Sequence, residues 1–151
     1  MNYITHNKEE HKEFKSLMKR IEKAEEDKKE AFQELFIKLH GHHSAEEEVI
    51  FPAIKEKATG EDLDVVMEMI EEHHLGNYEF SVINRTSEEN ETWDAKFAVL
   101  KEVLEHHMDE EEDELSEVAK KLLTKEELEG LMEEFEKVNE MRMKEKEKEI
   151  K

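Results

Sequence analysis

Histidine and glutamate side chains recur along this chain at spacings that would place them on one face of a helix. His42 precedes Glu46 by four residues, and His106 precedes Glu110 by the same distance. Residues four apart lie on the same helical face, so both side chains of a pair can reach a common point. Imidazole and carboxylate groups bind iron, zinc and manganese. Because the chain contains no cysteine, any metal must bind through His, Asp or Glu.

The two pairs belong to an internal repeat. The segments 42–48 (HHSAEEE) and 106–112 (HHMDEEE) share five of seven residues at an offset of 64. The tripeptide EEH at 9–11 recurs at 71–73, at an offset of 62. The pattern predicts two helical hairpins, each contributing a lone histidine followed by a His-x-x-x-Glu pair.

These polar residues interrupt stripes that are otherwise apolar. One face of the second helical segment carries, at steps of three or four, Phe32, Leu35, Leu39, His42, Glu46, Val49 and Ala53. His11 and His73 interrupt similar stripes elsewhere. A buried carboxylate without a partner costs several kcal/mol, so a glutamate on an inner face needs a cation, a proton or a hydrogen-bond donor.

Helix is the structure expected for the elements that position these residues. The chain has one proline and four glycines in 151 residues, with abundant Glu, Lys, Leu and Met, which favour helix. Apolar periodicity predicts five helices, at about 4–25, 28–58, 62–85, 93–123 and from 124 onward. Asp27 can cap the second helix, and Thr124 with Glu127 is a capping-box signal for the fifth.

The helix lengths and short connections favour an all-α, up-down-up-down four-helix bundle over residues 1–123. The remaining residues, 124–151, are expected to form a charged C-terminal helix that packs on the bundle or on a partner subunit.

A simple register argument places the histidines at one level. In an antiparallel hairpin, two residues are level when their midpoint falls in the turn. The midpoints between successive histidines fall near residues 26, 57 and 89, in or close to the predicted turns. The candidate ligands that meet in this layer are His11, His42, Glu46, His73, His106 and Glu110. Six inward ligands, two of them carboxylates, indicate a two-metal site.

These residues resemble the hemerythrin-like (HHE cation-binding) domain family over about residues 4–122. The family pattern is a lone histidine, His-x-x-x-Glu before Phe-Pro, a second lone histidine and a second His-x-x-x-Glu, and here Phe51-Pro52 follows the first pair. The resemblance implies a non-haem di-iron centre with an oxo or hydroxo bridge, in which zinc or manganese could substitute. It implies that His11, His42, His73 and His106 are nitrogen ligands and that Glu46 and Glu110 bridge the irons.

Two positions depart from the family pattern. Oxygen-carrying hemerythrins have a second histidine one turn after the first on their third helix, where this chain has Asn77. Leu115-Ser116 stands where Phe-Pro could have recurred. Two octahedral irons offer about 12 positions, of which the implied ligands and one bridging oxygen fill about 10. About one open position per iron would admit oxygen, nitric oxide or peroxide.

The sequence leaves open which histidine of each doublet faces inward. Phe97, Leu100 and Leu104 lead to His107 and Glu111, which extend a better apolar stripe than His106 and Glu110 do. The repeat and the family resemblance favour His106 and Glu110, and we follow them here. His43, His74 and His107 are then expected either to support the ligands from behind or, as the favoured alternative, to lie at the surface. Glu47 and Glu111 could instead accept hydrogen bonds from ligating imidazoles. His6 lies too far toward the N-terminus to share the layer.

Net charge and composition exclude several functions. There are 43 acidic residues against 23 Lys and Arg, and a net charge of −20 repels nucleic-acid phosphates and anionic membranes. We therefore expect no nucleic-acid or membrane partner. The first residues contain no basic segment that leads into an apolar run, so we expect a cytoplasmic protein, as a monomer or homodimer. The sequence contains no nucleophile–base pair or phosphate loop, which favours a metal- and ligand-binding protein over a classical enzyme.

The leading hypothesis is a di-iron protein that binds a diatomic ligand, O2 or NO, or handles iron and its redox state. The alternatives are a storage or sensing module that holds iron, zinc or manganese without catalysis, and a metal-free acidic interaction bundle.

Overall fold

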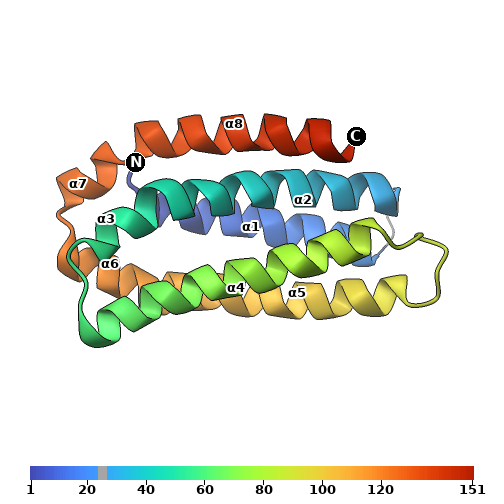
Figure 1. Ribbon diagram of the computed structural model, residues 1–151, viewed down its shortest axis with the longest axis horizontal. Helices are drawn as coiled ribbons and strands as arrows, with labels where there is room; N and C mark the ends of the chain where they lie inside the picture. Colours follow the sequence, from blue (N-terminus) through green and yellow to red (C-terminus); the bar gives the residue numbers. More distant parts are fainter. Residues whose placement is uncertain (24–26) are drawn as a thin grey trace.

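The computed structural model describes residues 1–23 and 27–151, and its fold class is the one that the sequence predicts. Four long helical rods alternate in direction and form a bundle (Figure 1). The first helix of each rod is, in chain order, α1 (Tyr3–Glu22), α2 (Lys28–Ala45), α4 (Gly60–Asn84) and α5 (Trp93–Glu110). Among the described residues, no helix combines the length and apolar character needed to cross a membrane.

Local capping signals predicted two of the helix starts. The Asp27 side chain accepts a hydrogen bond from the backbone N–H of Glu30 at the start of α2. Thr124 and Glu127 form the predicted reciprocal capping box. The predicted end of the first helix at residue 25 and the turn near residue 26 lie outside the described residues.

Two of the rods contain a π-helical turn that the sequence analysis did not predict. In the second rod, η1 (Glu46–Ile50) joins α2 to α3 (Phe51–Lys55). In the fourth, η2 (Glu111–Leu115) joins α5 to α6 (Ser116–Leu122). A π turn accommodates one extra residue and therefore rotates the helix that follows it. The buried stripe after Glu46 accordingly passes through Ile50 and Ile54, which are fully buried, while the predicted Ala53 is only partly buried.

The C-terminal residues form α7 (Lys125–Gly130) and α8 (Met132–Ile150). Helix α8 lies along α2 on the outside of the bundle (Figure 1). Gly41 permits the close approach, because a Cβ there would lie only 2.4 Å from the Met143 Cγ atom. Arg142 makes two hydrogen bonds to Glu48, each 2.8 Å long. The division of the chain at residue 123 stays a prediction.

The apolar core consists of two clusters. One, at the end that holds both π turns, includes Tyr3, Ile50, Ile54, Leu115 and Phe135. The other, toward the opposite end of the rods, includes Phe14, Leu35, Phe80, Phe97 and Leu104. Buried histidines and glutamates lie on the same rods between these clusters. The apolar side chains therefore shield a polar layer from water on both sides.

Candidate metal centre

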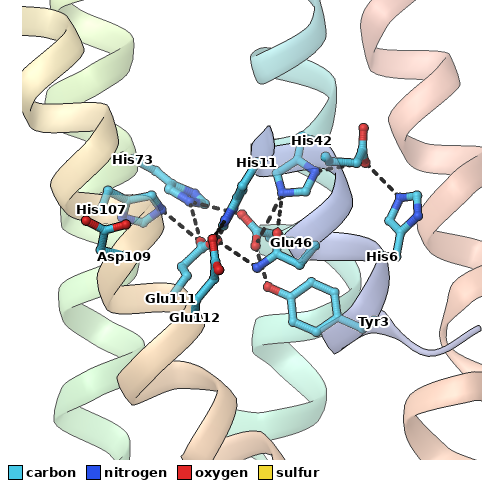
Figure 2. Close-up of polar contacts among 12 residues, drawn as sticks. Tyr3, His6, His11, His42, Glu46, His73, His107, Asp109, Glu111 and Glu112 are labelled. Carbon is cyan, nitrogen blue, oxygen red and sulfur yellow. Dashed lines mark hydrogen bonds and ion pairs between the residues drawn. The ribbon is translucent and has the colours of Figure 1, made fainter. Parts of the chain in front are cut away.

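Side chains from all four rods meet in this polar layer (Figure 2). Four imidazoles and two carboxylates are each at most 3% exposed: His11, His42, Glu46, His73, His107 and Glu111. Helices α1 and α4 each supply one histidine, and α2 and α5 each supply a histidine followed, four residues later, by a glutamate at the start of the π turn.

The two carboxylates lie between two pairs of histidines. Glu46 Oε2 lies 3.6 Å from His42 Nε2, while its Oε1 lies 3.2 Å from His73 Nε2. Glu111 Oε1 lies 3.1 Å from His11 Nε2, while its Oε2 lies 2.8 Å from His107 Nε2. Each glutamate therefore presents one oxygen to the pair His11 and His42, which we call the first half, and one to the pair His73 and His107, which we call the second half.

Several of these inward atoms lie close together without forming directed hydrogen bonds. The nitrogen Nε2 of both His73 and His107, Glu46 Oε1 and Glu111 Oε2 are buried and lack a hydrogen-bond partner. Leaving such groups unpaired costs free energy, which a cation among them would offset. Nitrogen and oxygen donors that point at a common centre suit iron, zinc or manganese. The residues present therefore fit a metal centre.

An outer set of four carboxylates lies next to the other ring nitrogen, Nδ1, of each inward histidine. The distances from Nδ1 to the carboxylate oxygen are 3.1 Å for His42 and Glu10, 2.7 Å for His107 and Glu72, 2.8 Å for His11 and Glu112, and 3.9 Å for His73 and Glu47. The first three are hydrogen bonds. Such a bond fixes the ring orientation, leaves Nε2 for a metal and raises its basicity.

The electrostatics of the layer favour positively charged histidines next to negatively charged glutamates. Burial alone would lower the pKa of His42, but the charge of Glu46 and the hydrogen bond with Glu10 raise this pKa to about 10. The pKa of His107 rises to about 10 for the same reasons, with Glu111 as its main partner. Burial opposes ionisation of Glu111, yet the nearby charge of His107 and the hydrogen bond from His11 Nε2 hold the pKa of that carboxyl well below the ordinary value.

The positions of His106 and Glu110 correct the sequence-based expectation. The structure brings His11, His42, Glu46 and His73 together as predicted, but the His106 side chain is 69% exposed and contacts Glu110 at the surface of the bundle. Alignment of the identical residues of the repeat matches His42 with His106. In the structure, the position equivalent to His42 is His107, one residue further on. The apolar stripe leading to His107 and Glu111 was the better guide, because burial depends on the helix face.

Two inward polar residues were missed altogether. The Tyr3 hydroxyl donates a 2.5 Å hydrogen bond to Glu46 Oε2. Asn7 donates to Glu111 Oε1 at 3.2 Å and accepts from His42 Nε2 at 2.8 Å. Tyr3, Asn7 and His11 succeed one another at steps of four, which places them on one face of α1. That spacing was the available signal.

The remaining histidines differ in their distance from the layer. His74 is exposed at the surface, as expected. His6 contacts Glu10 at 2.7 Å, which places it beside the outer carboxylates and outside the layer. His43 was expected at the surface, but its ring stacks on that of His73 with 3.8 Å between centroids. His43 therefore belongs to the site region.

A small pocket between α2 and α4 reaches the imidazoles from the surface. Its volume is about 80 Å³, and its walls include Phe36, Leu39, His43, His73, Asn77 and Phe80. A cavity needs about 10–15 Å³ of space open to a water-sized sphere to hold one water molecule. The pocket therefore has room for a few molecules of about that size.

The sequence and the fold both match known proteins. Residues 3–119 match the family described as Hemerythrin HHE cation binding domain. A solved structure of a hemerythrin HHE cation binding domain-containing protein from Mycobacterium kansasii is similar at a TM-score of 0.82 and 27% sequence identity, covering 96% of this chain and 89% of that one. The structural similarity therefore extends past the family match into the C-terminal helices. No curated protein matches the sequence.

Proposed function

Since this chain belongs to the hemerythrin HHE cation-binding domain family, we propose that it holds two iron ions and binds a diatomic ligand, O2 or NO, at them. The ligands in this proposal are His11, His42, Glu46, His73, His107 and Glu111. Glu111 and His107 replace Glu110 and His106 of the sequence-based hypothesis, because only the former pair faces the other ligands.

The arrangement of the carboxylates carries the proposal. Each of Glu46 and Glu111 directs one oxygen toward each half of the site. A carboxylate that served one ion would have no reason to present its second, buried oxygen to another pair of imidazoles. Two bridging carboxylates also contribute two negative charges, which compensate part of the charge that two divalent cations bring into a buried layer.

The surroundings favour a ligand of very few atoms. Iron bound by nitrogen and oxygen donors with an open position supplies redox-active binding of O2 or NO. The apolar side chains on both sides of the layer exclude bulk water. Tyr3 and Asn7 contribute hydrogen-bonding groups on the inner face. The small volume of the pocket argues against an organic substrate.

The stoichiometry and the visible spectrum of the protein test this function. Protein loaded with ferrous iron is expected to retain about two irons per chain, and its absorption is expected to change on addition of O2 or NO. A flat spectrum with two irons bound would leave metal storage or sensing, with iron, zinc or manganese, as the function. Failure to retain iron after supplementation would support a metal-free bundle and contradict the proposal.

A matched pair of variants tests the position of the site. Glu46→Ala removes a bridging ligand, so we expect loss of both irons and of the stabilisation that iron confers. Glu48→Ala, two residues away, removes a carboxylate that bonds Arg142 outside the layer, so both irons should remain. Equal iron content in the two variants, measured by elemental analysis, would show that Glu46 is not a ligand.

A further inference from the structure

His43 is an imidazole that the six-ligand site does not use. It follows His42 on α2, and adjacent residues on a helix point about 100° apart. His42 faces the first half of the site, and His43 faces the second. The His43 ring stacks on the His73 ring at 3.8 Å and meets the His107 ring edge-on, with centroids 5.5 Å apart.

A ligand atom of His43 lies close enough to the others to share an ion with them. One potential donor atom from each of His43, Glu46, His73 and His107 can be chosen so that all four lie within 4.8 Å of one another. Donor atoms on opposite sides of one ion, each about 2.1 Å from it, are about 4.2 Å apart. The four residues therefore form a group of the size that one cation requires.

The approximate symmetry of the site makes His43 stand out. In the structure, His42 of α2 and Glu46 of η1 correspond to His107 of α5 and Glu111 of η2, at an offset of 65. The same offset pairs His43 with Met108, which is fully buried in the apolar core. The second half of the site therefore has an additional imidazole that the first half lacks.

Among the inward residues of the second half, α4 supplies only His73. One turn after His73, α4 carries Asn77, and Asn77 and His43 line the same small pocket. His43 approaches this space from α2, on the opposite side of the pocket. His43 therefore forms part of the pocket wall beside His73.

We propose that His43 is a third imidazole ligand of the ion held by His73 and His107. This assignment rests on the proposed di-iron function. It makes the two ions unequal: the second half has three imidazoles, and the first half has two. About 11 of the 12 coordination positions of two octahedral irons would then be filled.

The variant His43→Leu tests the assignment, with His106→Leu as its control. Each change removes one histidine of a doublet, but His106 is exposed. The measurement is the rate at which a ferrous chelator removes each iron from loaded protein. We expect one of the two irons to leave His43→Leu at least tenfold faster than from the unchanged protein, since loss of even an outer hydrogen-bonding partner costs about 10- to 100-fold in metal affinity. His106→Leu should behave as the unchanged protein does.

Two further measurements keep the outcome decisive if His43→Leu folds poorly. X-ray absorption of the unchanged, iron-loaded protein should show an average of 2.5 imidazoles per iron, whereas a role limited to lining the pocket gives 2. In His43→Gly, added imidazole should restore slow release of the second iron.

Unchanged iron release in His43→Leu with an average of 2 imidazoles would overturn the His43 assignment while leaving the di-iron function intact. If the unchanged protein fails to retain two irons, the di-iron function itself fails, so the two results are distinguishable.

Discussion

The two halves of the polar layer contain the same kinds of candidate ligands and have outer carboxylates beside their histidines. They differ in the other polar residues around them. Each half has a lone histidine, a paired histidine and one oxygen from each of Glu46 and Glu111. Around the first half lie Tyr3 and Asn7. The corresponding positions of α4, at the offset of 62, are the apolar Val65 and Met69.

In the proposed di-iron centre, the repeated residues would hold the two ions, and the exceptions to the repeat would give the two positions different chemistry. Hydrogen-bonding groups line the first half, and an extra imidazole lies at the second. A site built only from the repeated residues would bind two equivalent ions. In the proposed centre, each ion would have a different environment.

The largest effect is expected from the glutamates that both halves share. Glu111→Ala should lose both irons, because it removes an oxygen from each half, and the thermal midpoint should no longer rise when iron is added. Glu110→Ala is the matched control, since the Glu110 side chain is partly buried but contacts the exposed His106, outside the set of six buried side chains. Elemental analysis and thermal unfolding with and without iron provide the measurement. Retention of one iron by Glu111→Ala would contradict its bridging position.

A second prediction concerns pH and treats the halves alike. His42 and His107, one from each half, have pKa values raised from 6.5 to about 10 by their carboxylate partners. Protein stripped of metal should therefore keep the full stabilisation from these charges below pH 6.5 and lose it progressively as pH rises from 6.5 to 10. At about 1.4 kcal/mol per pKa unit, the shift of each histidine corresponds to a loss of about 5 kcal/mol.

Metal-loaded protein should lack this decline, because a bound imidazole is already neutral. Chemical denaturation of stripped and zinc-loaded protein between pH 6 and pH 10 measures the difference. A stripped protein whose free energy of unfolding is constant over that range would contradict the charged pairs.

The smallest effects are expected from the outer carboxylates, which can be changed one half at a time. Glu10→Gln should weaken the ion of the first half and Glu72→Gln that of the second, each by about 10- to 100-fold. Glu71→Gln is the control, because Glu71 is exposed and contacts only the exposed His74 among the described histidines. Competition with a ferrous chelator measures each affinity. If both variants weakened the same ion, the separation into halves would be wrong.

Much of the fold was predictable from local patterns. Periodicity and the Asp27 and Thr124 caps indicated the helices, because these signals depend on neighbouring residues alone. The level of the histidines followed from the same short turns. Four of the six candidate residues, His11, His42, Glu46 and His73, meet where the register argument placed them.

The errors came from one-residue shifts, to which those patterns are insensitive. Choosing His107 instead of His106 as the candidate ligand moves the hairpin midpoint by only half a residue. The register argument therefore cannot distinguish the two histidines. The π turns were missed because an extra residue in a helical turn changes the buried face without any glycine or proline to signal it. His43 was placed at the surface because its contact with His73 joins two helices and leaves no local pattern.

The two π turns also restrict how the length of this chain can vary. Each begins at a glutamate of the metal layer, so its extra residue rotates everything downstream relative to that glutamate. Deleting a single residue from 46–50 or 111–115 would restore ordinary helix and turn the following segment by about 100°, exposing side chains such as Ile54 or Ala119 that are now fully buried. Homologous chains should therefore vary in length at 86–92 and keep a fixed number of residues within these turns.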